Sequence, residues 1–121
     1  MTWKAKVEEA AQLVDEGEYS AELIDIQDRD GEHGPMARLE FRILEDEQWE
    51  DSHVAGIANK KLSEGTKLGQ WVAALLGKLP DVGKEVTHDA LLGRPCRIHV
   101  GHKANGQGQV FANVQQVLPR T

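Results

Sequence analysis

The sequence predicts an all-β domain in which five short strands form a small barrel, with one helix inserted between the third and fourth strands. Segments of alternating apolar and polar residues recur along the chain. The alternation is interrupted near the middle, where apolar residues recur at steps of three and four instead. With 121 residues, 40% of them hydrophobic, the chain suffices for one core of ordinary size. We therefore expect one domain over residues 17–118, preceded by an arm or short helix over residues 1–16.

The first three strands are expected to form a meander. Residues 18–27 are rich in Tyr, Leu and Ile, and a polar run with two glycines and a proline, residues 28–35, predicts an exposed loop after them. Residues 36–44 alternate cleanly, which is typical of a half-buried strand. An acidic connection, residues 45–51, leads to a third strand over 53–59, in which Ala55 and Ile57 are expected to face inward.

The helix is predicted between Lys60 and Gly77. Either Ser63 or Thr66 can cap it, it runs to Leu76, and Gly77 suits the position that follows a helix. A second short turn is expected over 87–92.

Two more strands complete the pattern. Residues 95–100 place Cys96, Ile98 and Val100 inward, Asn105-Gly106 suits a hairpin, and residues 110–118 form the last strand. Three strands, a helix and a hairpin is the order of an OB-type Greek-key barrel. Another small barrel or an open α+β sheet remains an alternative, because periodicity predicts element type better than topology.

The net charge of -6 argues against a general polyanion binder. The charge is uneven: residues 1–51 contain 16 acids and 5 bases, whereas residues 52–121 contain 4 acids and 9 bases. This asymmetry favours an anionic partner for a basic part of the surface.

The sequence also predicts a cytoplasmic protein without membrane contact. It has no apolar run of the length that a spanning helix needs, and its start lacks the apolar stretch of a signal peptide. The single cysteine, Cys96, is expected to be a buried thiol.

Three segments together resemble a family of small phage and prophage proteins regarded as OB-fold single-stranded DNA-binding or recombination-associated proteins. They are Gly-Glu-Tyr-Ser-Ala from residue 17, Gly-Pro-Met from residue 34, and Leu-Leu-Gly-Arg from residue 91. The resemblance covers about residues 17–118 and lies in the order and spacing of the segments. It implies binding of single-stranded DNA with little sequence preference, a role in replication or recombination, and a partner protein from one of those processes.

Such binding needs cations along a groove and aromatic faces for the bases. The outward cations, one histidine and one aromatic residue near the last hairpin are the candidates: Arg38, Arg42, Lys60, Lys61, Arg97, His99, Lys103 and Phe111. Lys67 could join Lys60 and Lys61 in a local positive patch, and Trp49 is a further exposed aromatic candidate. Each cation could instead pair with a neighbouring acid or remain solvated. Trp71 and Phe41 are expected in the core.

No catalytic motif, metal site or cofactor is predicted. Cys96, His99 and His102 are spaced by three. On an extended strand, His99 would therefore point to the face opposite that of Cys96 and His102. We therefore expect a non-enzymatic protein. The alternative function is a protein-protein adaptor or phage assembly component without nucleic-acid binding, and assembly of several copies is left open.

Overall fold

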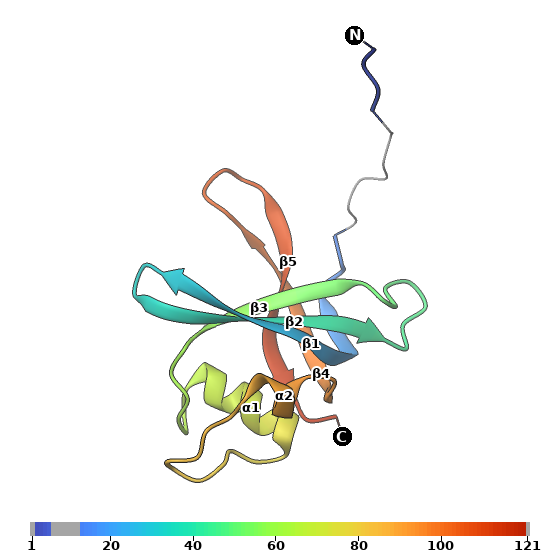
Figure 1. The fold of residues 1–121 in the computed structure, drawn as a ribbon. Helices are drawn as coiled ribbons and strands as arrows, with labels where there is room; N and C mark the ends of the chain where they lie inside the picture. The colour runs from blue at the N-terminus through green and yellow to red at the C-terminus, as the bar shows by residue number, and fades with distance from the viewer. Residues whose placement is uncertain (1, 6–12, 121) are drawn as a thin grey trace.

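The computed structural model describes residues 2–5 and 13–120, and the chain is mostly β (Figure 1). Its strands are β1 (Gly17–Gly31), β2 (Gly34–Leu44), β3 (His53–Asn59), β4 (Pro95–Ala104) and β5 (Val110–Leu118). Two helices, α1 (Lys67–Leu76) and α2 (His88–Leu91), lie between β3 and β4. The predicted five strands and the inserted helix are thus confirmed.

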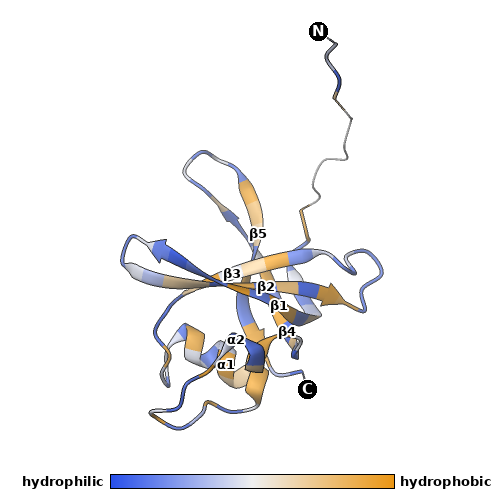
Figure 2. Ribbon diagram, viewed as in Figure 1, coloured by the Kyte–Doolittle hydropathy of each residue, from blue (hydrophilic) through white to orange (hydrophobic). Residues whose placement is uncertain are grey.

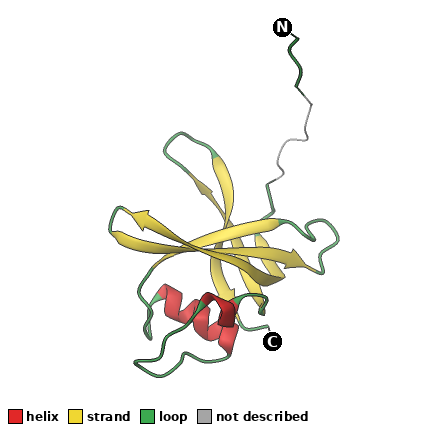
Figure 3. Cartoon of the chain, viewed as in Figure 1, coloured by secondary structure: helices red, strands yellow, loops and turns green. Residues whose placement is uncertain are grey.

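The five strands close into a ring in the order β1-β2-β3-β5-β4. Neighbours are antiparallel except β3 and β5, which run parallel and share one bridge, between Ala55 and Asn113. Both helices lie below one end of the ring, and the β1–β2 and β4–β5 hairpins project from it (Figures 1 and 3). Beyond the bridge, β3 and β5 diverge and leave a fork.

The core fills the ring and extends onto α1. Alternate residues of β2 (Ala37, Leu39, Phe41 and Ile43) are buried, as the sequence predicted. Trp71 of α1 is 2% exposed and packs against β3 at Gly56, where an added Cβ would lie 2.6 Å from its ring. The helix therefore covers one end of the ring through a large apolar side chain.

The boundaries of α1 follow the sequence signals. Thr66 is the N-cap, since its Oγ1 accepts a hydrogen bond from the Gly69 amide at 3.0 Å. Gly77 follows the helix with φ of 90°, a left-handed conformation that favours glycine.

Three expectations about the strands were wrong. The polar run after residue 27 continues as strand, because β1 and β2 pair as far as Gly31 and Gly34. The inward residues of β3 are Val54, Gly56 and Ala58, so Ala55 and Ile57 face outward. The small side chains of this strand gave no clear apolar face from which to assign the parity. Finally, β4 extends four residues further than predicted, to Ala104.

Part of the expected N-terminal arm or helix, residues 6–12, lies outside the described residues. Residues 13–16 lead into β1 without helical structure, and Val14 is buried. His102 holds this segment through its ring Nε2, 2.7 Å from the Val14 carbonyl, and its amide donates to Glu16. In the described part of the chain, no helix is long and apolar enough to cross a bilayer.

Candidate nucleic-acid interface

Acidic neighbours pair with four of the predicted cations. Arg38 pairs with Glu40 at 3.2 Å, and Arg97 pairs with Glu18 at 3.2 Å. Lys60 lies 2.8 Å from Asp28. The two arginine contacts lie on the outward face of the strands, where neighbouring opposite charges attract. The Lys60–Asp28 pair lies on the other face, beside the helical segment.

Arg42 is the most strongly held of the four. Its guanidinium donates to Glu22, with a Nε to Oε1 distance of 3.0 Å, and to Asp51 at 3.1 Å. The hydrogen bonds that Arg42 donates to Glu22, reinforced by the negative charge of Glu22, raise the pKa of Arg42 above its usual value. A phosphate would have to compete with two carboxylates for this side chain, so Arg42 is a poor phosphate ligand.

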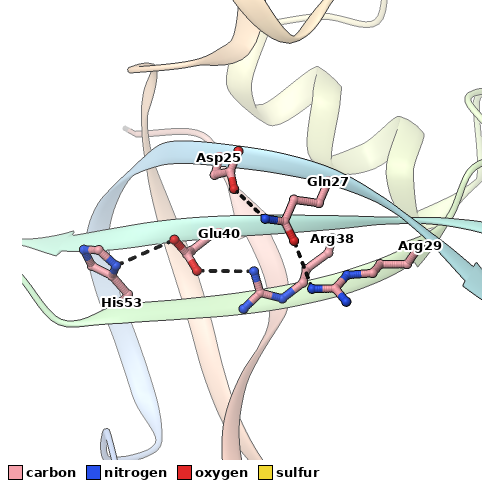
Figure 4. Close-up of polar contacts among 6 residues, drawn as sticks. All are labelled: Asp25, Gln27, Arg29, Arg38, Glu40 and His53. Atoms are coloured by element: carbon pink, nitrogen blue, oxygen red, sulfur yellow. Dashed lines mark hydrogen bonds and ion pairs between the residues drawn. The ribbon is translucent and has the colours of Figure 1, made fainter.

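Figure 4 shows polar contacts between side chains on the outward face of β1, β2 and β3. Glu40 lies between Arg38 and His53, whose Nδ1 is 3.6 Å from the carboxylate. On β1, Gln27 accepts from Arg29 at 2.9 Å and donates to Asp25 at 3.0 Å. This face presents mixed, paired charge and does not form the expected continuous basic groove.

The remaining cations gather at the fork between β3 and β5. We use the name lysine patch for Lys61, Lys67 and Lys103 together with the exposed side chains of Ile57 and Phe111. Within the described residues, no acidic side chain lies within ion-pair distance of these three lysines. Their positive charges are therefore available to an anion.

Lys67 occupies the fork. Its Nζ donates to the Ile57 carbonyl at 3.0 Å and lies 5.0 Å from the centre of the Trp71 ring. Partial burial, and secondarily the positive charge of Lys103, lowers the pKa of Lys67. The two ammonium groups are thus close enough to repel each other, and an anion between them would relieve that repulsion.

The apolar members flank these lysines. Ile57 is 45% exposed and, with Lys61 and Lys67, lines a hollow of about 360 Å³. Phe111 is 44% exposed and is the cross-strand partner of Lys103 in the projecting hairpin. Figure 2 shows that the β5 side of this hairpin is apolar where it leaves the turn. Exposed apolar side chains therefore lie next to lysines at the fork, the combination that binding of bases and phosphates needs.

Asn113 adds a polar group where β3 and β5 part. Its Oδ1 is buried and finds no hydrogen-bond donor among the described residues. A buried acceptor without a donor costs stability.

The structure therefore brings together Lys61, Lys103 and Phe111, and it places Arg38 beside them, as the cross-strand neighbour of Ile57. It separates Arg42, Arg97 and His99 from the patch: Arg42 lies at the β2–β3 connection, and Arg97 and His99 lie in the part of β4 that pairs with the start of β1. His99 is exposed and pairs in register with Glu18. Lys60 pairs with Asp28 of β1 and lines a different hollow from Lys61.

One patch member was missed, and one aromatic candidate was wrong. Ile57 was assigned to the core through the parity error in β3. Lys67 was expected to join Lys60 and Lys61, and it lines the same hollow as Lys61, whereas Lys60 pairs with Asp28. Trp49 is only 7% exposed, because Asp46 accepts from its amide at 2.7 Å and folds the acidic connection onto the core. The expected core positions of Trp71 and Phe41 are confirmed.

The chain matches no known family model, and no curated protein matches it.

Proposed function

We propose that the protein is an OB-type domain that binds single-stranded DNA with little sequence preference through the lysine patch. The strand order β1-β2-β3-β5-β4, with a helix between β3 and β4, supports the OB assignment. The observation that carries the function is the group of three lysines without acidic partners, flanked by exposed Ile57 and Phe111.

The chemistry explains the low sequence preference. Ammonium groups contact phosphates without reading bases, and an aromatic face stacks on any base. The proposed contacts are phosphates at Lys61, Lys67 and Lys103 and one stacked base at Phe111. A role in phage replication or recombination, and membership of the family named above, belong to the same proposal.

The first test is a titration of fluorescein-labelled oligo(dT), followed by anisotropy at low salt and at physiological salt. The wild-type protein should bind at low salt and weaken as salt rises, because released counterions drive phosphate contacts. No change in anisotropy at tens of micromolar protein, even at low salt, would exclude the proposal and favour the adaptor function.

Charge-matched variants localise the site. The Lys61→Glu/Lys103→Glu variant should lose binding at every salt concentration. The control, Lys78→Glu/Lys84→Glu, alters net charge by the same amount at exposed positions outside the patch and should retain binding. Equal losses in both variants would show that net charge, and not the patch, governs the affinity.

The stacking contact has its own comparison. Phe111→Ala should weaken binding by about 1 kcal/mol or more, the usual worth of one stacked base. Val110→Ala removes a neighbouring exposed side chain, 52% exposed, and should have little effect.

A further inference from the structure

A second surface, separate from the lysine patch, lies along the free edge of β1. The pairing of β1 with β4 ends at Glu22, and the backbone of Leu23 bonds to Gly93 and Arg94. From Ile24 to Gly31, the edge that faces away from β2 has no strand neighbour in the described part of the chain. This free edge is eight residues long, spans about 26 Å, and could serve as a template for another strand.

An apolar groove of about 590 Å³ borders this edge. It lies between the β1–β2 hairpin and the helical segment, and Lys60 and His88 stand at its rim. Apolar side chains from both walls line it: Ile26, Ala37, Leu39, Leu68, Val72 and Leu91. The groove continues into a second hollow of about 600 Å³, because Leu62 and Val86 line both. Apolar side chains of an added strand would therefore find a surface on which to pack.

The charge along the edge indicates which kind of molecule could bind there. Between Ile24 and the turn after Gly31 the chain carries four acids (Asp25, Asp28, Asp30 and Glu32) and one base, Arg29. Asp28 is already paired with Lys60 at 2.8 Å, so the negative excess of the edge comes from Asp25, Asp30 and Glu32. A second copy pairing through the same edge would set these acids against their equivalents, which is unfavourable. A nucleic acid would be repelled as well. A peptide with basic residues would complement the acids.

We propose that the free edge of β1 and the adjoining groove bind an extended, basic peptide segment of a partner protein by strand addition. Backbone hydrogen bonds to residues 24–31 would hold the segment, and its alternate apolar side chains would enter the groove beside Ile26. Its Lys or Arg side chains would then lie on the outward face, which carries Asp25. This site is independent of the proposed DNA binding.

The test uses labelled octapeptides that alternate Val or Ile with Lys, followed by fluorescence anisotropy. The lysine peptide should bind, and the same peptide with Glu in place of Lys should not. A third peptide, N-methylated at alternate amides, keeps the charge and the apolar side chains but loses the edge hydrogen bonds, so its binding should be lost. No binding of the lysine peptide at hundreds of micromolar, or equal binding of the methylated peptide, would overturn the proposal.

Variants and amide exchange locate the peptide. Asp25→Lys/Asp30→Lys should weaken binding of the lysine peptide roughly tenfold or more, because two acids without an ion-pair partner among the described residues are replaced by charges that repel the peptide. The control, Glu47→Lys/Glu50→Lys, makes the same change of charge in the exposed β2–β3 connection and should bind normally. Bound peptide should slow hydrogen exchange of amides within residues 24–31, whereas protection elsewhere would contradict strand addition. Oligo(dT) should not displace the peptide, and loss of oligo(dT) binding alone would leave this inference standing.

Discussion

At residue 56, the lack of a side chain allows α1 to approach the sheet. A Cβ on Gly56 would lie 2.6 Å from the Trp71 ring and 2.7 Å from the Val114 carbonyl. Both neighbours are buried, and one is backbone, so neither can move aside at low cost. Adding one methyl group at this position would therefore overpack the core.

We predict that Gly56→Ala lowers the free energy of unfolding by about 1–3 kcal/mol, the usual cost of overpacking. Urea denaturation followed by Trp fluorescence measures this change. Gly106→Ala is the matched control: its added Cβ meets no atom within 4 Å, and the change should stay within about 0.5 kcal/mol. An equal loss in both variants would show that the cost is not steric.

Cys96 illustrates a different effect of burial. Its side chain is 1% exposed, and desolvation raises the pKa of the thiol from 9.0 to about 12. The thiolate, which is the reactive form, is therefore suppressed in the folded protein.

We predict that iodoacetamide modifies Cys96 slowly at pH 9 in the native protein and rapidly in urea. Mass spectrometry measures the extent of alkylation.

Because the folded state retains the proton longer, the contribution of this thiol to stability is complete below pH 9 and is lost as the pH rises toward about 12. The difference in stability between the wild type and Cys96→Ala should fall over that range, and a constant difference would contradict the raised pKa.

At the scale of an element, Thr66 determines where α1 begins. Its Oγ1 accepts from the amides of Gly69 and Ser63, at 3.0 and 3.2 Å, and donates to the Ser63 carbonyl at 2.8 Å. One hydroxyl thus fixes both the first turn of the helix and the loop before it.

We predict that Thr66→Ala lowers the free energy of unfolding by about 1 kcal/mol. Thr87→Ala provides the comparison, since Thr87 is the N-cap residue of α2 but its side chain makes no capping hydrogen bond. That variant should change stability by less than about 0.5 kcal/mol. Thermal denaturation followed by circular dichroism distinguishes the two, and similar losses would contradict the assigned role of Thr66.

At the scale of the whole molecule, paired charges cover the outward faces of β1, β2 and β3, and unpaired lysines remain at the fork. Because Arg38, Arg42, Lys60 and Arg97 are held by acids, few cations are available for phosphates. The proposed binding therefore rests on three lysines.

The salt dependence of DNA binding measures the number of phosphate contacts. Single strands release about 0.7 counterion for each phosphate contact, so three contacts predict a slope of roughly -2 in a plot of log K against log salt concentration. A slope near -4 or steeper would show that the paired arginines also leave their acids to contact phosphate. Titrations at four or more salt concentrations give the slope.

The sequence by itself determined the number and order of the elements. The alternation of Ala37, Leu39, Phe41 and Ile43 could form only a strand with one buried face, and Thr66 and Gly77 set the ends of α1 by local chemistry. These signals depend on residues close together in the sequence, so they can be recognised without knowledge of the fold. The candidate cations could also be read, as residue types that face outward.

Only the tertiary structure decided which of those cations are available. Glu22 lies 20 residues from Arg42, and Glu18 lies 79 residues from Arg97, yet the pairing of β1 with β2 and β4 brings each acid to its partner. The same closure parts β3 from β5 and leaves Lys67 in the fork beside Lys103. Electrostatic pairing depends on distance in space, and strand register, which joins residues far apart in sequence, sets that distance.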